Sequence, residues 1–204
     1  MTPEKNYNDL FSIDELDSEI RHRKKRKETA TLVKTIINSI IVVAAVAVLV
    51  AHLVFPIMRV NGTSMEPILS DGDIITSVKG IWLIERGDII AFYYNDKVLL
   101  KRVIGLPGDV IDIDGDGYVY VNKKKINEPY LNQRSLGICD VNFPVTVEEN
   151  AVFVLGDHRS VSVDSRSRDV GNINYERIIG KIFFRVYPFT SFSKMPFKSF
   201  NFLM

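Results

Sequence analysis

One apolar segment, from Thr35 to Pro56, constrains the fold of this chain more than any other feature. It contains no Lys, Arg, Asp or Glu, and a helix of this length spans ~30 Å of hydrocarbon at ~1.5 Å per residue. A cleaved signal peptide is the competing interpretation, but its apolar region is normally ~7–15 residues long and follows a short basic start. Because this segment is longer and follows a polar tail, we predict one uncleaved transmembrane anchor at residues 35–56.

The distribution of basic residues predicts the orientation of this anchor. Basic residues cluster just before it, whereas the first ones after it are Arg59 and Lys79; the upstream cluster is Arg21, Arg23, Lys24, Lys25, Arg26, Lys27 and Lys34. The positive-inside rule therefore makes residues 1–34 a cytoplasmic tail and places residues 57–204 outside the cytoplasm. A net charge of +1 gives no reason to expect nucleic acid. We expect a single-pass protein of the cell membrane that has the lipid bilayer as a partner.

Beyond the anchor the composition changes to short β-branched and aromatic runs separated by Gly, Asp and Asn, which is typical of strands. The expected strands cover 74–78, 89–94, 97–105, 110–113, 118–121, 152–155 and 178–186. The segment from Asp112 to Gly117 resembles the start of a calcium loop, but the required acid at the twelfth place is Lys123, so we predict a hairpin turn. Residues 122–147 are predicted to be a polar, irregular insertion. The domain is therefore mostly β.

A short turn soon after the anchor presents a serine, in the sequence Asn61-Gly62-Thr63-Ser64-Met65-Glu66-Pro67. Gly62 tolerates unusual dihedral angles, and Pro67 restricts the residue before it and fixes the bend. Such a turn holds a hydroxyl close to backbone N–H groups, as an acyl-transfer nucleophile requires. Serine is also an ordinary turn residue, so the catalytic interpretation depends on a base elsewhere in the chain.

Two residues are candidates for that base. His158 is the one histidine after the anchor, and Asp164 follows it, so a Ser-His-Asp set is available. Lys101 ends the run Val98-Leu99-Leu100-Lys101, in which apolar surroundings would lower the pKa of its amine. A strand-edge lysine with its ammonium group in water fits the same pattern. The residues alone leave these alternatives open.

The segment from Gly156 to Arg166 is dense in short polar and charged side chains directly after an apolar strand. Its Ser162 and Ser165 can form hydrogen bonds, and Asp164 can pair with Arg166, although a polar surface loop is the simpler interpretation. The single cysteine, Cys139, cannot form an internal disulfide and has no neighbouring helper group, so we predict that it is a packed or loop residue.

Four motifs, in this order after an anchor, resemble the type I signal peptidase family and its single-anchor Gram-positive branch. They are Ser64-Met65-x-Pro67, Arg86-Gly87-Asp88-Ile89-Ile90, Lys101 to Asp109, and Gly156-Asp157-x-Arg159 with Ser162-x-Asp164-Ser165-Arg166. The resemblance covers residues from about 30 to 190, and 37 positions separate the serine from the lysine (101 − 64). It implies a Ser-Lys endopeptidase on a curled, barrel-like, mostly antiparallel β-sheet, which needs no metal ion and no cofactor.

The resemblance also implies a role for each matched residue. Ser64 would be the nucleophile and Lys101 the general base, Ser162 would position the lysine amine, and Asp164 with Arg166 would brace the loop. The oxyanion would be held by the backbone N–H of Ser64. Relatives often have a hydroxyl at the position of Gly62, so here only the Gly62 backbone could assist.

The implied substrates are pre-proteins that carry a signal peptide with small residues before the cut, processed at the outer face of the cytoplasmic membrane. Met65 and the strand residues Val98, Leu99 and Leu100 would border the bound peptide. The family usually has Asn at the position of His158. Relatives that use histidine in place of the lysine carry it at the lysine position, which here is Lys101.

Two further interpretations belong to other classes. A membrane-tethered β domain can bind extended peptides by strand addition, in which case Ser64 and Lys101 would be incidental. A self-cleaving Ser-Lys protease of the repressor type has a similar fold, but such proteins are soluble and the anchor disfavours them.

Overall fold

The computed structural model describes residues 13–80, 84–188 and 193–194 of the chain. The chain divides into two compact units, Met1–Ala51 and His52–Met204. In the described residues the first unit is helical and the second contains the β domain.

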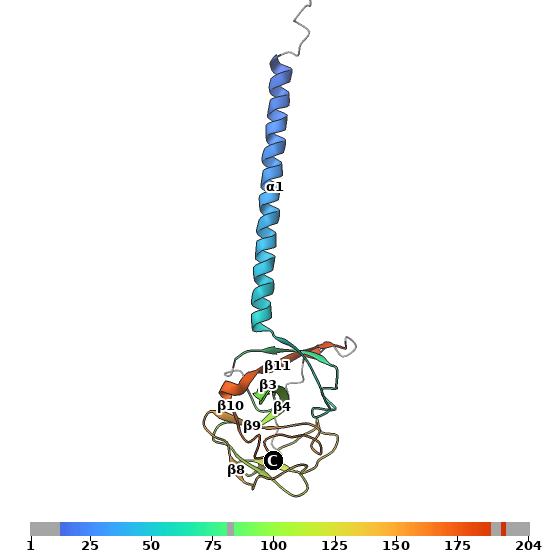
Figure 1. Cartoon of the computed structure of the whole chain (residues 1–204), viewed down its shortest axis with the longest axis vertical. Helices are drawn as coiled ribbons and strands as arrows, with labels where there is room; N and C mark the ends of the chain where they lie inside the picture. The colour runs from blue at the N-terminus through green and yellow to red at the C-terminus, as the bar shows by residue number, and fades with distance from the viewer. Residues whose placement is uncertain (1–12, 81–83, 189–192, 195–204) are drawn as a thin grey trace, which may run out of the picture. The chain divides into compact units, whose positions relative to one another are not determined.

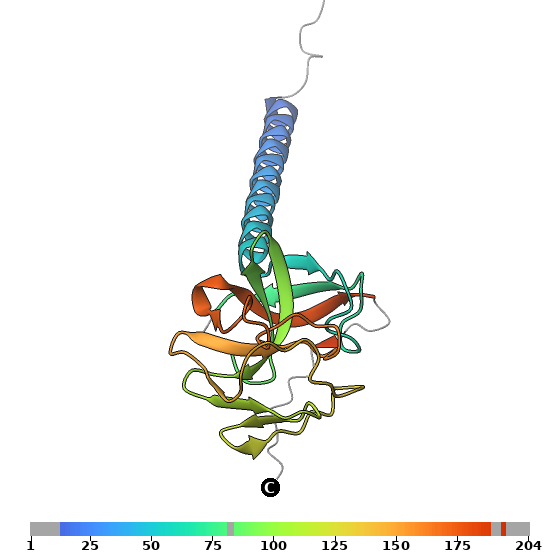
Figure 2. The ribbon, with the colours of Figure 1, turned by 60° about the horizontal axis from the view of Figure 1, so that its bottom comes forward.

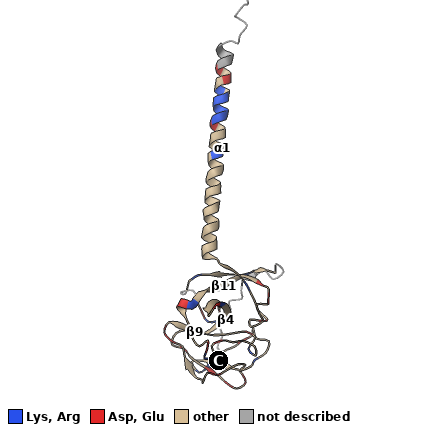
Figure 3. Cartoon of the chain, in the orientation of Figure 1, with Lys and Arg blue, Asp and Glu red and all other residues tan. Residues whose placement is uncertain are grey.

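The described residues of the first unit belong to one long helix, α1 (Ile13–Val54), which ends three residues past the unit (Figure 1). It begins 22 residues before the predicted anchor (35 − 13), because the preceding segment is rich in Glu, Lys and Arg, which are good helix formers. Pairs four residues apart support this part, with Arg21 3.8 Å from Asp17 and Arg23 3.2 Å from Glu19. The charges gather in the N-terminal part of α1 (Figure 3). An 18-residue window of the helix has a mean hydropathy of 2.6, so its length and composition suffice to cross a membrane.

The β domain is built on an antiparallel sheet whose order is β1-β2-β11-β3-β4-β9-β10, with β12 paired to β11 (Figure 2). A 3-10 helix, η3 (Tyr175–Arg177), precedes the longest strand. The strands are β1 (Ile57–Arg59), β2 (Ile74–Val78), β3 (Ile89–Tyr94), β4 (Lys97–Gly105), β9 (Ala151–Leu155), β10 (Ile173–Asn174), β11 (Ile178–Tyr187) and β12 (Ser193–Lys194). The prediction of a mostly β, antiparallel domain after one apolar helix is confirmed.

A second antiparallel sheet has the order β7-β6-β5-β8. Two of its strands are only two residues long and lie inside the segment that we expected to be irregular. Its members are β5 (Val110–Ile113), β6 (Val119–Val121), β7 (Lys124–Lys125) and β8 (Val145–Thr146). The insertion is therefore tied to the domain by strand pairing, with Val145 opposite Ile111 and Thr146 opposite Val110.

The central strands of the larger sheet are covered on both faces. Along β3, Ile89 and Ala91 belong to one buried cluster, whereas Ile90 and Phe92 belong to another. Since side chains alternate across a strand, a strand covered on both faces is a continuous apolar run. The neighbouring β4 changes character along its length, because residues 97–100 are exposed or half-buried and residues 101–105 are buried. Lys101 lies at this change.

Candidate active site

Ser64 lies on the segment 61–67 between β1 and β2, which we call the nucleophile turn. Gly62 has a φ of 95°, which a residue with a side chain rarely adopts. The Glu66 N–H donates to the Thr63 carbonyl at 3.1 Å, and the Leu69 N–H donates to the Met65 carbonyl at 3.0 Å. Because Met65 and Leu69 are fully buried in the core, the turn is anchored beside Ser64 while Ser64 itself stays half-buried.

Lys101 reaches this turn from β4. It pairs across the sheet with Ile90 of β3, and only 2% of the residue is exposed. Its Nζ lies 2.8 Å from the Oγ of Ser64, which is hydrogen-bond distance. The structure therefore brings together the two residues that the sequence proposed as nucleophile and base, 37 positions apart in the chain.

Burial lowers the pKa of the Lys101 amine from 10.5 to about 8, because the charged form loses hydration. The carboxylates of Asp164 and Asp157 oppose this shift, and the Arg166 guanidinium adds to it. The amine is thus neutral in a substantial fraction of molecules near physiological pH. A neutral amine can accept a proton from the hydroxyl to which it is hydrogen-bonded.

The segment 156–166, which we call the Ser162 loop, is held by a buried ion pair. The Arg166 Nε and Nη2 each donate to an oxygen of Asp164 at 2.8 Å, and the second of these oxygens also accepts the Gly156 N–H at 2.9 Å. Both side chains are at most 1% exposed. A bidentate pair of this kind fixes direction as well as distance, so the loop has a rigid frame close to Lys101.

Ser162 is completely buried, yet its Oγ forms no hydrogen bond with any residue in the described ranges. The expected bond to the Lys101 amine is therefore not formed in this structure. A Cβ on Gly156 would collide with the Ser162 hydroxyl and would lie 2.7 Å from the Ser64 carbonyl oxygen. The absence of a side chain at Gly156 thus lets Ser162 and the nucleophile turn approach one another.

The two backbone groups expected to hold the oxyanion differ in the structure. The Gly62 N–H donates to the carboxylate of Asp71 at 2.7 Å, so it is already engaged. The Ser64 N–H donates to no acceptor within the described part of the chain. The geometry therefore favours Ser64 over Gly62 as the donor, and Asp71, which the sequence analysis did not single out, is the reason.

His158 contacts the nucleophile turn without contacting Lys101. Its backbone N–H donates to the Ser64 carbonyl at 3.0 Å, and its ring Nδ1 lies 3.3 Å from the Thr63 carbonyl oxygen. The Ser64 hydroxyl is instead hydrogen-bonded to the Lys101 amine. Lys101 therefore lies where a base for Ser64 would act, and His158 contacts the turn through the carbonyl groups of Thr63 and Ser64 and through the Glu66 carboxylate.

Two buried ion pairs beneath the site were missed in the sequence. Arg102, next to Lys101, donates to Asp157 through Nε at 2.8 Å and through Nη2 at 2.6 Å. Arg159 pairs with Glu128, and the ring of Tyr130 lies 4.1 Å from the Arg102 guanidinium carbon. Glu128 and Tyr130 belong to the polar insertion, where only the combination of an acid and an aromatic residue could have indicated burial. The first pair connects β4 to the Ser162 loop, and the second connects that loop to the polar insertion.

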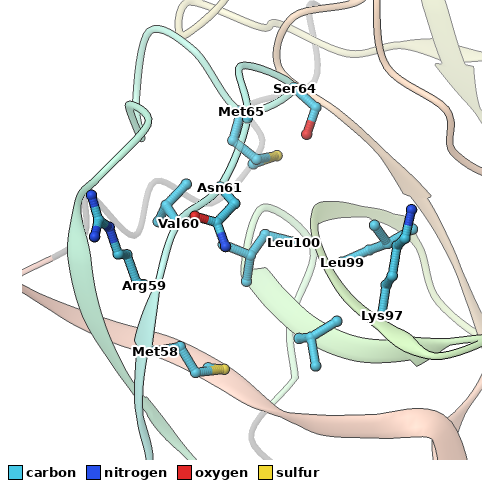
Figure 4. A pocket seen from close by; sticks show the side chains of 11 residues that line it. Met58, Arg59, Val60, Asn61, Ser64, Met65, Lys97, Leu99 and Leu100 are labelled. Atoms are coloured by element: carbon cyan, nitrogen blue, oxygen red, sulfur yellow. The ribbon is translucent and has the colours of Figure 1, made fainter.

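An open groove of about 570 Å³ runs beside Ser64. Figure 4 shows Met58 to Asn61 along one side and the start of β4 along the other, with Ser64 and Met65 at one end. The predicted substrate residues Met65, Val98, Leu99 and Leu100 all line it, and so do five residues that were not predicted: Met58, Arg59, Val60, Asn61 and Lys97. Two strand-like walls with apolar side chains suit an extended peptide, which offers alternate side chains to each wall.

A serine hydroxyl hydrogen-bonded to a buried amine, beside a groove suited to an extended peptide, is the arrangement of a serine peptidase. Comparison with known proteins agrees with this class. The family described as "Signal peptidase, peptidase S26" matches residues 33–187. The signal peptidase I of Bacillus licheniformis is 35% identical over 170 residues, which cover 78% of this chain and 90% of that protein.

Two further relatives carry the same description. Signal peptidase I S of Bacillus subtilis is 34% identical over 168 residues, 77% of this chain and 90% of that protein. A solved signal peptidase I from Enterococcus faecalis is 30% identical and aligns with 48% of this chain and 95% of its own, with a TM-score of 0.39. The chain belongs to the signal peptidase family, peptidase S26, and is a serine endopeptidase. The strand-addition binder without enzymatic activity is thereby set aside.

Proposed function

We propose that this protein removes signal peptides from secreted pre-proteins with a Ser64–Lys101 dyad and an acyl-enzyme intermediate. One observation carries the proposal: the Lys101 amine is 2.8 Å from the Ser64 hydroxyl and sits in a buried setting that lowers its pKa to about 8. A base must be within hydrogen-bond reach of the proton that it removes, and its pKa should lie near the working pH. Lys101 meets both conditions.

In the first step the neutral Lys101 amine takes the proton of Ser64, and the Ser64 oxygen attacks the carbonyl carbon of the scissile peptide bond. The oxyanion that forms accepts a hydrogen bond from the Ser64 N–H, which has no acceptor within the described residues. The Lys101 ammonium then gives its proton to the leaving amine. Water, deprotonated by the same amine, cleaves the resulting ester and restores the Ser64 hydroxyl.

The residues of the Ser162 loop act on the lysine rather than on the substrate. The unpartnered Ser162 hydroxyl is available to the amine when the lysine moves away from Ser64 during the reaction. An unsatisfied buried hydroxyl costs ~1–3 kcal/mol, so a transient bond to the ammonium would recover that cost at the intermediate. Asp164 and Arg166 hold the loop in place for this contact.

The groove determines the substrate class. A peptide extended along Val98, Leu99 and Leu100 places alternate side chains against the same wall. By family membership, we assign small residues such as Ala to the first and third positions before the cut.

α1 and family membership support a membrane anchor. The basic residues before the anchor favour a cytoplasmic N-terminus and a β domain at the outer face.

The reaction is tested with the purified full-length protein, a pre-protein, and sequencing of the new N-terminus of the product. Wild type should cut once, after the small residues, whereas Ser64→Ala and Lys101→Met should release no product. Lys79→Met, a substitution of an exposed lysine on the same domain, is the matched control and should cut normally. Turnover by Lys101→Met at the wild-type rate would refute the dyad.

The orientation is tested separately, in cells from which the wall has been removed. Protease added outside should digest epitopes placed after Val60 and spare those placed before Thr35. Protection of the β domain in intact cells would contradict an outward-facing site without affecting the assignment of the dyad.

A further inference from the structure

The role of His158 is not explained by the proposed chemistry. We propose that His158 is a positioning residue that fixes the peptide planes on both sides of Ser64, and so directs the Ser64 hydroxyl and the Ser64 N–H. The inference rests on the proposed function, because it concerns the geometry of the same nucleophile.

The contacts of His158 with the nucleophile turn act on two consecutive peptide planes. Its backbone N–H donates to the Ser64 carbonyl at 3.0 Å, and its ring Nδ1 lies 3.3 Å from the carbonyl oxygen of Thr63. A carbonyl oxygen only accepts hydrogen bonds, so Nδ1 carries the hydrogen in this contact. One residue therefore holds the carbonyl groups immediately before and after the Ser64 Cα.

Because the peptide bond is planar, these contacts also fix the direction of the Ser64 N–H. The Thr63 carbonyl and the Ser64 N–H belong to one rigid plane and point in opposite directions. Whatever fixes the Thr63 oxygen therefore also fixes the direction of the Ser64 N–H, the proposed oxyanion donor. With the following carbonyl held as well, both backbone dihedral angles of Ser64 are restrained, and the Oγ stays aimed at Lys101.

His158 is itself held in place by hydrogen bonds within the Ser162 loop. Its own carbonyl accepts the N–H groups of Val161 at 3.2 Å and Ser162 at 3.1 Å. The Ser162 loop is in turn held by the bidentate ion pair between Asp164 and Arg166. His158 thus links the nucleophile turn to the Ser162 loop. On the side of the turn, the carboxylate of Glu66 lies 4.0 Å from the same ring nitrogen.

Side-chain substitutions can separate the ring contact from the backbone contacts, which any residue at this position retains. In Asn the amide nitrogen is as many bonds from Cβ as Nδ1 is in histidine, so His158→Asn restores a donor to the Thr63 carbonyl. In Gln the amide is one bond further away, and Ala has no donor. The series Asn, Gln and Ala therefore tests the position of one hydrogen-bond donor.

We expect His158→Ala and His158→Gln to lower kcat by about fivefold, the effect of losing one ordinary hydrogen bond in the reacting state. KM should not change, because His158 does not line the groove. His158→Asn should keep kcat within about twofold of wild type. Ser160→Ala, an exposed residue of the same loop, is the control and should behave as wild type.

The decisive measurements are kcat and KM on a pre-protein substrate, together with the burst rate of Ser64 acylation, which should fall in the Ala and Gln variants alone. Equal kcat values for wild type and His158→Ala would refute the positioning role of His158. A His158→Asn variant as slow as His158→Ala would refute it as well. Failure of the proposed function is recognised differently, since wild type itself would then not cut, or Ser64→Ala would still cut.

Discussion

The lowered pKa of Lys101 predicts how the rate depends on pH. With a pKa of about 8, roughly one amine in ten is neutral at pH 7, whereas with the ordinary value of 10.5 about three in ten thousand would be. Burial therefore raises the concentration of active base by about 300-fold, since ~2.5 pKa units separate the two values. We expect kcat/KM to rise about tenfold per pH unit below pH 7 and to level off above pH 8.

The same shift predicts the effect of removing the amine on stability. Between about pH 8 and 10.5 the unfolded chain binds a proton at Lys101 that the folded chain does not, so stability rises with pH across this window. Below pH 8 both states hold the proton, and the folded state bears the full cost of ~3 kcal/mol, from ~2.5 units at ~1.4 kcal/mol each. Lys101→Met, which leaves an apolar side chain of similar length, should remove most of this cost at pH 7.

Two assays examine these expectations with the full-length protein in detergent. Initial rates from pH 6 to 9.5 measure how kcat/KM rises with pH and where it levels off. Thermal unfolding at pH 7 should show Lys101→Met melting about 5–10 °C higher than wild type. The difference should shrink as the pH approaches 10. A flat rate profile, or an inflection near ~6.5 that disappears in His158→Asn, would refute the reasoning and assign the base to the imidazole.

Three further predictions concern the nucleophile, its surroundings and the groove. Ser64→Ala should lose all turnover and melt within ~2 °C of wild type, because the residue is half-buried and outside the core clusters; unfolding of the variant would show a structural role. Gly156→Ala should lower kcat at least about fivefold, since the added Cβ meets Ser162 and the Ser64 carbonyl and overpacking costs ~1–3 kcal/mol. Normal kinetics would contradict the close approach of Ser162 to the nucleophile turn. A pre-protein with Phe in place of Ala at the first or third position before the cut should not be processed. Equal processing of the Phe and Ala versions would show that the peptide does not bind along the wall of Leu99 and Leu100.

Much of the β domain could be predicted because its signals are local. The strands β2, β3, β4 and β5 have the predicted bounds, since each is a β-branched or aromatic run that ends at a Gly, Asp or Asn turn. The helix extends from the predicted anchor into the polar tail, because Glu, Lys and Arg favour a helix even where no apolar stripe marks one. In the second sheet the hairpin of β5 with β6 was predicted, but β7 and β8 were not, because two-residue strands carry no pattern and the pairing of Val145 with Ile111 joins residues 34 positions apart (145 − 111).

The candidate site shows the same division between what is local and what is not. The residue types of Ser64 and Lys101 indicated their chemistry, and the motifs indicated their order. Their approach to 2.8 Å depends on the pairing of β4 with β3 and on the anchoring of the turn by Met65, neither of which is a property of a single segment. The engagement of Gly62 by Asp71 could not be foreseen for the same reason.

The change in β4 from open groove to buried interior at Lys101 has a consequence for how the cleavage position is chosen. The wall that would hold the peptide and the base that would start the reaction are successive residues of one strand, so the distance between them is a fixed number of ~3.3 Å steps. The strand would therefore fix the number of peptide residues between the side chains held by the wall and the bond that is cut. A peptide shifted by one residue turns every side chain to the opposite face, so the bond to be cut is set by the spacing of the small side chains at the first and third positions before it.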